Sequence, residues 1–213
     1  MRLFGTIVIG IVALVGSSAQ AQLPVVKEAR ADWQGCAYSL KVLQGADPYA
    51  PWQILYRVTV QSEVVSSATC TLTPRSVELG TSKNTPEVAI AVNADGLAAA
   101  WTYGEYIRGY GTWGRARIHR LDPSTLSTLR LAGLQSSYVP SNGGAGMPGV
   151  ITLYGLTLNA GNLEVSGSFT GNSITEDPAT ISWPYPILTG NNFVATYPGF
   201  FGQVAQSPSI VTF

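Results

Sequence analysis

Aromatic side chains and glycines are interleaved in the run WTYGEYIRGYGTWGRARIHR. Tyr106, Tyr110 and Trp113 stand among glycines, a composition that favours an exposed loop. Loop aromatics stack well on sugar rings or pack on a partner, because they offer a large contact area at low entropic cost. We expect a platform for a neutral ligand such as a glycan, or for a protein partner, bordered by Arg108 and Arg115. The alternative is that the three rings pack in the core.

Basic residues follow at alternate positions of the predicted strand that ends this run. Arg115, Arg117 and His119 share one face of that strand, whereas Ala116 and Ile118 share the other. We expect the apolar face to point inward and the cationic row to face solvent. There it solubilises the surface or, alternatively, binds carboxylates or sulfates.

Catalytic signatures are sparse in this sequence. His119 is the single histidine, and no G-x-S-x-G, H-E-x-x-H or phosphate-cradling motif is present. Glu105 and Asp122 form a candidate carboxylate pair for glycoside hydrolysis, an alternative that requires a shared pocket. We expect neither a metal site nor a cofactor, and a non-catalytic protein is the favoured interpretation.

The first 21 residues have the features of a cleaved secretory signal. Arg2 precedes an apolar stretch that is too short to span a membrane as a helix, and small residues mark a cleavage site before Gln22. The predicted location is secreted or periplasmic. In such an oxidising compartment the only two cysteines, Cys36 and Cys70, are expected to form a disulfide.

Charge is low and balanced over the chain. Charged residues make up 11% of the sequence, with 12 basic and 12 acidic side chains. A neutral chain lacks the electrostatic footprint of a protein that binds nucleic acid or anionic lipid. We therefore expect no nucleic-acid partner, while a glycan or protein partner at the cell surface remains open. We also expect no membrane insertion, because no later segment is longer or more apolar than the stretch at 3–15.

Two segments have the pattern of β-hairpins, and period-two alternation at 54–60 predicts a further strand. In the first hairpin the turn Asn-Ala-Asp-Gly joins alternating residues at 87–92 and 97–103. In the second, Asn-Ala-Gly-Asn joins 150–158 to 163–169. Their likeness is interpreted as convergent turn chemistry.

Several other segments have a weaker strand pattern, and most aromatic residues outside the glycine-rich run are expected to pack. The additional predicted strands are 37–43, 67–73, 114–121, 179–183 and 192–197. Packing is expected for Trp33, Trp52 and Trp101, and for a second group that covers one end of the core: Trp183, Tyr185, Tyr197, Phe200 and Phe201.

The fold class predicted from these patterns is all-β. We expect a signal peptide at 1–21, an extended segment at 22–33 and one antiparallel β-sandwich-type domain at 34–213. A small propeller-like assembly is the alternative, and a division into two domains near Thr85 is a third possibility.

Three functional classes follow, in order of preference. The first is a secreted binding or adhesion module that uses the aromatic loop, which requires exposed, clustered rings. The second is a structural or assembly subunit of a cell-surface complex, which an unpaired hydrophobic edge strand would favour. The third is a hydrolase, which requires a concave pocket with two of Glu105, Asp122 and His119.

Overall fold

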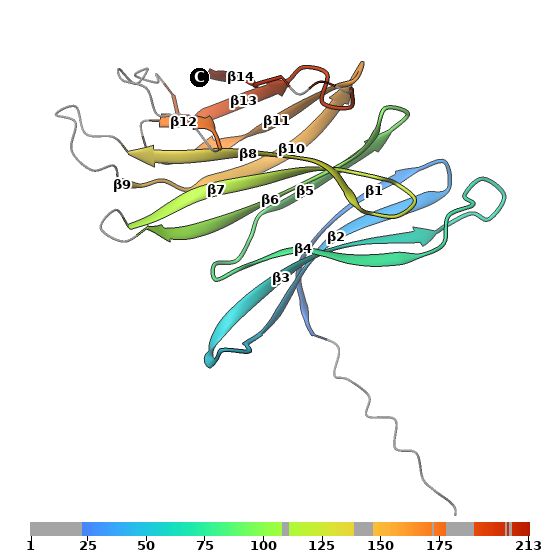
Figure 1. The fold of residues 1–213 in the computed structure, drawn as a ribbon, viewed down its shortest axis with the longest axis horizontal. Helices are drawn as coiled ribbons and strands as arrows, with labels where there is room; N and C mark the ends of the chain where they lie inside the picture. The colour runs from blue at the N-terminus through green and yellow to red at the C-terminus, as the bar shows by residue number, and fades with distance from the viewer. Residues whose placement is uncertain are drawn as a thin grey trace, which may run out of the picture.

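The computed structural model describes residues 23–107, 111–138, 147–171, 173–177, 190–202, 204 and 206–213. At 105–107, 111–113, 137–138 and 147–148 the description covers the backbone alone. The described chain contains strands and turns and no helix, and its strands form three antiparallel sheets, none of them closed (Figure 1). The predicted all-β class is confirmed.

Each sheet is built mainly from strands that are close in sequence. The N-terminal sheet has the order β1 (Val25–Trp33), β2 (Cys36–Asp47), β3 (Ala50–Val64) and β4 (Arg75–Ser82). The central sheet has the order β12 (Ser173–Glu176), β8 (Thr128–Tyr138), β7 (Gly111–Leu121), β6 (Gly96–Ile107) and β5 (Val88–Asn93), and β9 (Met147–Pro148) also pairs with β8. The C-terminal sheet has the order β10 (Ile151–Asn159), β11 (Asn162–Phe169), β13 (Asn192–Tyr197) and β14 (Ser209–Thr212).

Both predicted hairpins are confirmed, and their turns touch each other. In the β10–β11 turn Ala160 and Gly161 have φ values of 49° and 79°, the left-handed backbone of a tight hairpin turn. In the β5–β6 turn the side chain of Asn93 accepts the N–H of Asp95 at 2.8 Å. The carboxylate of Asp95 then accepts the N–H of Gly161 at 3.1 Å, so the two hairpins are joined at their ends.

The central sheet is covered on both faces. Along β6, Ala98 and Ala100 pack with the C-terminal sheet, whereas Leu97, Ala99 and Trp101 pack with the N-terminal sheet, which is why both sets are buried. The sequence predicts one sandwich-type domain. The structure has three layered sheets, in which the N-terminal sheet packs on one face of the central sheet and the C-terminal sheet packs on the other (Figure 1).

The predicted Cys36–Cys70 disulfide is confirmed, with the two Cα atoms 5.1 Å apart. The strand predicted at 67–73 is wrong: this segment is a turn followed by irregular backbone. The carbonyl of Ser66 accepts the N–H of Cys70 at 2.9 Å, a local turn that competes with strand pairing. The disulfide therefore fixes this loop to the start of β2.

The aromatic side chains divide between core and surface. Trp101, Tyr197 and Phe200 are buried, as predicted. Trp33 and Trp52 are exposed, so the prediction that they pack in the core is wrong; at Trp52 the reason is that β4 pairs with β3 only from Tyr56 onward. Trp183 and Tyr185, like the strand predicted at 179–183, lie outside the described residues.

Candidate functional site

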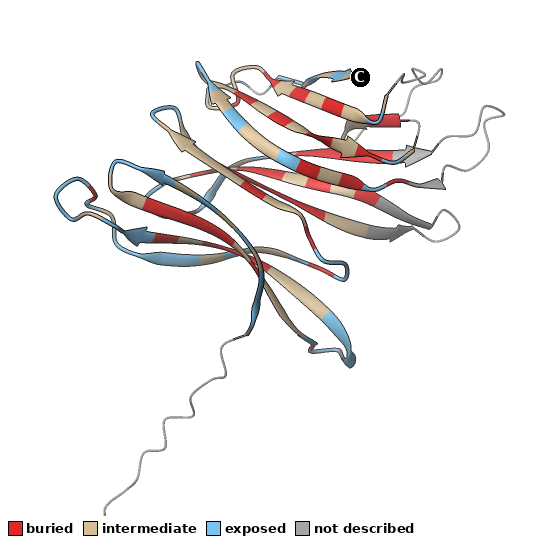
Figure 2. Cartoon of the chain, turned by 180° about the vertical axis from the view of Figure 1, so that it is seen from behind, coloured by how far each residue is buried: buried red, intermediate tan, exposed pale blue. Residues whose placement is uncertain are grey.

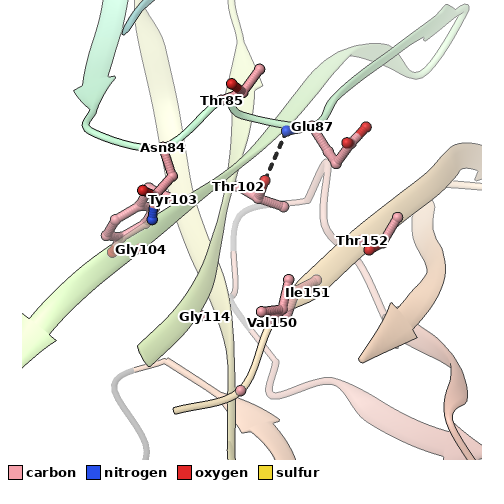
Figure 3. A pocket seen from close by; sticks show the side chains of 11 residues that line it. Asn84, Thr85, Glu87, Thr102, Tyr103, Gly104, Gly114, Val150, Ile151 and Thr152 are labelled. Atoms are coloured by element: carbon pink, nitrogen blue, oxygen red, sulfur yellow. Dashed lines mark hydrogen bonds between the residues drawn. The ribbon is translucent and has the colours of Figure 1, made fainter. Parts of the chain in front are cut away.

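A pocket of about 410 Å³ opens at the edge of the central sheet, near the start of β10. Three parts of the chain surround it: the connection from β4 to β5, the adjacent strands β6 and β7, and the segment that leads into β10 (Figure 3). The lining residues are Asn84, Thr85, Glu87, Thr102, Tyr103, Gly104, Gly114, Gly149, Val150, Ile151 and Thr152.

The pocket forms because β5 is shorter than β6. Their pairing begins with Val88 opposite Trp101, so β6 continues past the end of its neighbour. Just beyond, the N–H of Thr102 donates to the carbonyl of Glu87 at 3.0 Å, and the N–H of Glu87 donates to the Thr102 hydroxyl at 2.8 Å (Figure 3). Since N–H and C=O directions repeat every second residue, the backbone groups of Gly104 face the same edge. In the described chain no strand pairs with that edge of Gly104.

Glycines bring the walls of the pocket together. A Cβ atom at Gly114 would collide with the carbonyl oxygen of Gly149, and one at Gly149 would collide with the hydroxyl of Ser136. The same segment is held from the other side, because the N–H of Val150 donates to the Thr170 hydroxyl at 2.8 Å. The glycines therefore let β7 lie directly against the chain that enters β10.

Hydrogen-bonding groups line the pocket without a net charge. In the part of the chain that the structure describes, the hydroxyls of Thr85, Tyr103 and Thr152 make no hydrogen bond. The one acidic lining residue, Glu87, is paired with Lys27 at 2.7 Å. These features suit a neutral ligand with several hydroxyl groups, because each free protein hydroxyl both donates and accepts.

The aromatic ring of Tyr103 forms part of one wall of the pocket. The ring of Tyr103 lies 5.2 Å from that of Trp101, between centroids, and the Arg117 guanidinium carbon is 5.0 Å from the Tyr103 centroid. In Figure 3 Tyr103 lies beside Asn84, while Val150, Ile151 and Thr152 approach from β10. Tyr103 is thus held in place by its neighbours on the sheet.

The aromatic residues predicted to bind ligand belong to the hairpin that rises from this wall. Arg108 and Tyr110 lie outside the described residues, and only the backbone is described at Tyr106 and Trp113. That backbone is strand, with Tyr106 opposite Thr112, so the predicted loop is shorter than its glycines suggest. Their role in binding stays a prediction.

Arg115, the fifth predicted binding residue, contacts an acidic partner. Its Nη1 lies 2.9 Å and 3.0 Å from the two carboxylate oxygens of Asp177, and both side chains are mostly buried. The backbone N–H of Asp177 donates to the carbonyl of Gly133 at 3.0 Å. This contact fixes the end of β12 to β7 and β8, and a ligand at Arg115 remains a prediction.

The cationic row does not face solvent freely as predicted, because its side chains contact residues of neighbouring strands in the central sheet and Asp177. His119 is buried, accepts a hydrogen bond from Trp101 Nε1 at 3.2 Å, and lies with Nδ1 3.0 Å from the Thr128 hydroxyl. Since Nε2 accepts, Nδ1 carries the proton of the neutral ring. Burial first, and then the charge of Arg117, lower the pKa of His119 from 6.5 to about 4.

Asp122, the other described candidate for hydrolysis, organises a turn. Its carboxylate accepts hydrogen bonds from the hydroxyl and N–H of Ser124 and from the N–H of Thr125, at 2.6 to 2.9 Å. These bonds lower the pKa of Asp122. Neither Asp122 nor His119 lines the 410 Å³ pocket, and the Glu105 side chain lies outside the description.

The residues that the structure describes contain neither a metal-binding cluster nor a membrane-spanning helix. Within those ranges no three His, Cys, Asp or Glu side chains converge to hold a metal ion. No helix of the described chain has the length and apolar character to cross a membrane. In comparisons with protein-family models, with curated proteins and with solved structures, nothing matches this chain.

The sequence interpretation missed most of the pocket. Asn84 and Thr85 lie where the sequence suggested only a possible domain boundary, whereas Glu87 and Thr152 belong to predicted strands and were given no role in binding. The pocket depends on β6 continuing as Thr102–Gly104 after its partner β5 has ended. The sequence does not reveal this difference, because the lengths of strands are set by tertiary pairing.

Proposed function

We propose that this protein is a secreted or periplasmic non-catalytic binding module, and that its pocket takes a neutral, hydroxyl-rich ligand of the glycan class. The observation that carries the proposal is the edge of β6 at Gly104, which is flanked by the free hydroxyls of Thr85, Tyr103 and Thr152. A sugar presents matching donors and acceptors, and the Tyr103 ring offers it an apolar surface.

The aromatic hairpin extends this proposed site. Tyr103 and Gly104 line the pocket, and the chain continues from them to Tyr106 and, on the returning strand, Trp113. We assign Tyr110 and Arg108, between the two strands, to contacts with the outer part of the same ligand. A longer glycan then begins in the pocket and runs along the hairpin.

The proposed module comprises a signal peptide at 1–21 and one sandwich-type domain. In this domain the central sheet faces the N-terminal sheet on one side and the C-terminal sheet on the other. We propose no nucleic-acid partner, because the chain is neutral, and no membrane insertion, because the apolar stretch at 3–15 is shorter than a membrane-spanning helix requires. An assembly subunit is the second candidate function, since Tyr49 and Trp52 at the β2–β3 tip are exposed. Hydrolysis is the third and least favoured.

The test is a titration of the mature chain with a panel of neutral oligosaccharides, followed by isothermal calorimetry. Tyr103→Phe and Thr152→Val each remove one hydroxyl at nearly constant shape, and each should weaken binding about 3- to 10-fold for one lost hydrogen bond. Thr196→Val, on β13 and away from the pocket, is the control and should bind as the parent does. Equal affinity in all four proteins, or no binding of any neutral saccharide, contradicts the proposal.

A further inference from the structure

A groove crosses the end of the molecule where the β1–β2 turn lies near the β7–β8 connection. It consists of two hollows of about 330 Å³ and 430 Å³, which share four lining residues: Trp33, Gln34, Tyr38 and Pro123. The smaller hollow extends to the disulfide-bonded loop at 67–73 and the larger to the β5–β6 turn, and Figure 1 shows these connections at one end of the molecule. Among the described residues, this Trp33 groove has no lining residue in common with the 410 Å³ pocket.

Tyr38 brings a hydroxyl without a partner to the place where the two hollows meet. The residue is only 4% exposed, and Figure 2 shows a buried stretch of β2 directly after the exposed β1–β2 turn. Yet the hydroxyl makes no hydrogen bond in the described chain, and its oxygen is not closed off from solvent. Burial first, and then the charge of Asp122, raise the pKa of Tyr38, so the hydroxyl stays protonated and can donate. Since buried polar groups are normally hydrogen-bonded, a ligand acceptor in the groove would supply the missing partner.

Two further donors stand at the same junction. Trp33 is 37% exposed, and neither its indole N–H nor the amide of Gln34 makes a hydrogen bond within the described chain. An indole N–H can only donate, and the Gln34 amide offers two N–H groups. The free side-chain groups where the hollows meet are therefore mainly donors.

The charged residues of the groove are already engaged. Asp95, the one acid in its lining, accepts from the side chain of Asn93 and the N–H of Gly161. Arg120, the one base, donates to the carbonyl of Gly202 at 3.0 Å and lies over the Phe201 ring. The groove thus favours a ligand without charge.

The walls of the groove are held in place by the fold itself. The carbonyl of Gly35 accepts the N–H groups of Val65 and Ser66 at 2.8 and 2.9 Å, and the disulfide ties the start of β2 to the loop that follows them. On the other wall, the hydrogen bonds to the Asp122 carboxylate hold the β7–β8 connection. A wall that is already ordered lowers the entropic cost of binding.

We infer that the Trp33 groove binds an extended, proline-rich peptide segment of a protein partner. A polyproline II helix makes no internal hydrogen bonds, and its prolines carry carbonyl acceptors but no N–H donors. Such a ligand matches a groove whose free groups mainly donate, and its rings can pack on the Trp33 indole and on Pro123. A glycan matches this donor excess less well, because each of its hydroxyls also donates.

The test is isothermal calorimetry of the mature chain with an acetylated, amidated decaproline peptide. Tyr38→Phe should weaken binding about 3- to 10-fold for one lost hydrogen bond. Trp33→Ala should weaken it roughly tenfold or more, because it removes the aromatic contact. Trp52→Ala removes an exposed tryptophan outside the groove, and Tyr103→Phe changes the other pocket; both controls should bind the peptide as the parent does.

A variant of Gln34 separates binding from folding. Gln34 and Gly35 have φ values of 48° and 76°, a left-handed pair for which Asn, Asp and Gly are the usual residues. Gln34→Gly should therefore melt at or above the parent temperature while it weakens peptide binding. A parent chain that does not bind the peptide overturns the inference, and so does unchanged affinity in Tyr38→Phe and Trp33→Ala. Binding of neutral oligosaccharides that Tyr38→Phe weakens also overturns it, because it would assign the groove to glycans.

Discussion

Acidification below pH 6.5 should destabilise this protein through His119. The ring is buried and neutral in the fold, held between Trp101 and Thr128. Its pKa is about 4 in the folded chain and has the ordinary value of 6.5 when the ring is exposed. Between these values the unfolded chain binds a proton that the folded chain does not, so stability is complete above pH 6.5 and declines as pH falls toward 4.

The magnitude follows from the two pKa values. A folded-state pKa of about 4 against 6.5 gives a loss of about 2 kcal/mol in unfolding free energy between pH 7 and pH 5. Asp122 does not contribute in this interval, because its lowered pKa affects stability only below its ordinary value of 3.8. His119 is the only histidine, so no other imidazole titrates there.

The assay is urea unfolding of the parent and of His119→Gln at several pH values from 7 to 5. The variant should be less stable than the parent at pH 7, because glutamine reproduces only one of the two ring contacts. Its unfolding free energy should nevertheless be nearly independent of pH in this interval. A parent protein as stable at pH 5 as at pH 7, or an equal slope in both proteins, refutes a buried neutral His119.

Three further predictions concern stability and are read from the unfolding free energy. Reducing the Cys36–Cys70 bond, which closes a separation of 34 residues, should cost about 4 kcal/mol, and an unchanged denaturation midpoint would contradict this. Trp101→Ala should cost about 3 to 5 kcal/mol, whereas Trp52→Ala should stay within about 0.5 kcal/mol; equal effects would show that their burial is misassigned. Gly80→Ala places a Cβ 2.6 Å from the Trp101 ring and should cost about 1 to 3 kcal/mol, so a neutral effect would mean that the ring moves freely.

Local sequence signals predicted the hairpins and the disulfide. The β10–β11 turn has left-handed backbone at Ala160 and Gly161, which the glycine adopts without strain, and the Asp-Gly signal places Gly96, with a φ of 149°, at the end of the β5–β6 turn. The strand predicted at 192–197 matches β13 in full. These features depend on a few neighbouring residues, or on the fact that the chain has only two cysteines.

The third sheet was not predicted, although a signal for it exists. Residues 97–101 read Leu-Ala-Ala-Ala-Trp, apolar at odd and even positions alike, which is typical of a strand buried on both faces. The alternation at Arg115–His119 pointed instead to one solvated face. His119 is buried there beside Trp101 and Thr128 of the neighbouring strands, and periodicity within one strand does not reveal such partners.

The pocket itself was not predicted from the sequence. Tyr103 and the hairpin that follows it were recognised from their composition, but the pocket depends on where β5 ends and where β10 begins. Trp52 was expected to pack because it flanks the segment that carries Cys36, whereas β4 pairs with β3 only from Tyr56 onward and leaves Trp52 exposed.

The most direct test of the proposed ligand site is an amide NMR titration of the ¹⁵N-labelled mature chain with neutral oligosaccharides. The free backbone edge at Gly104 makes its N–H the group expected to respond most strongly, followed by those of 149–152 across the pocket. The account predicts saturable shifts centred on these amides and reduced by Tyr103→Phe. Shifts that are absent there, or that centre on another surface, would contradict it.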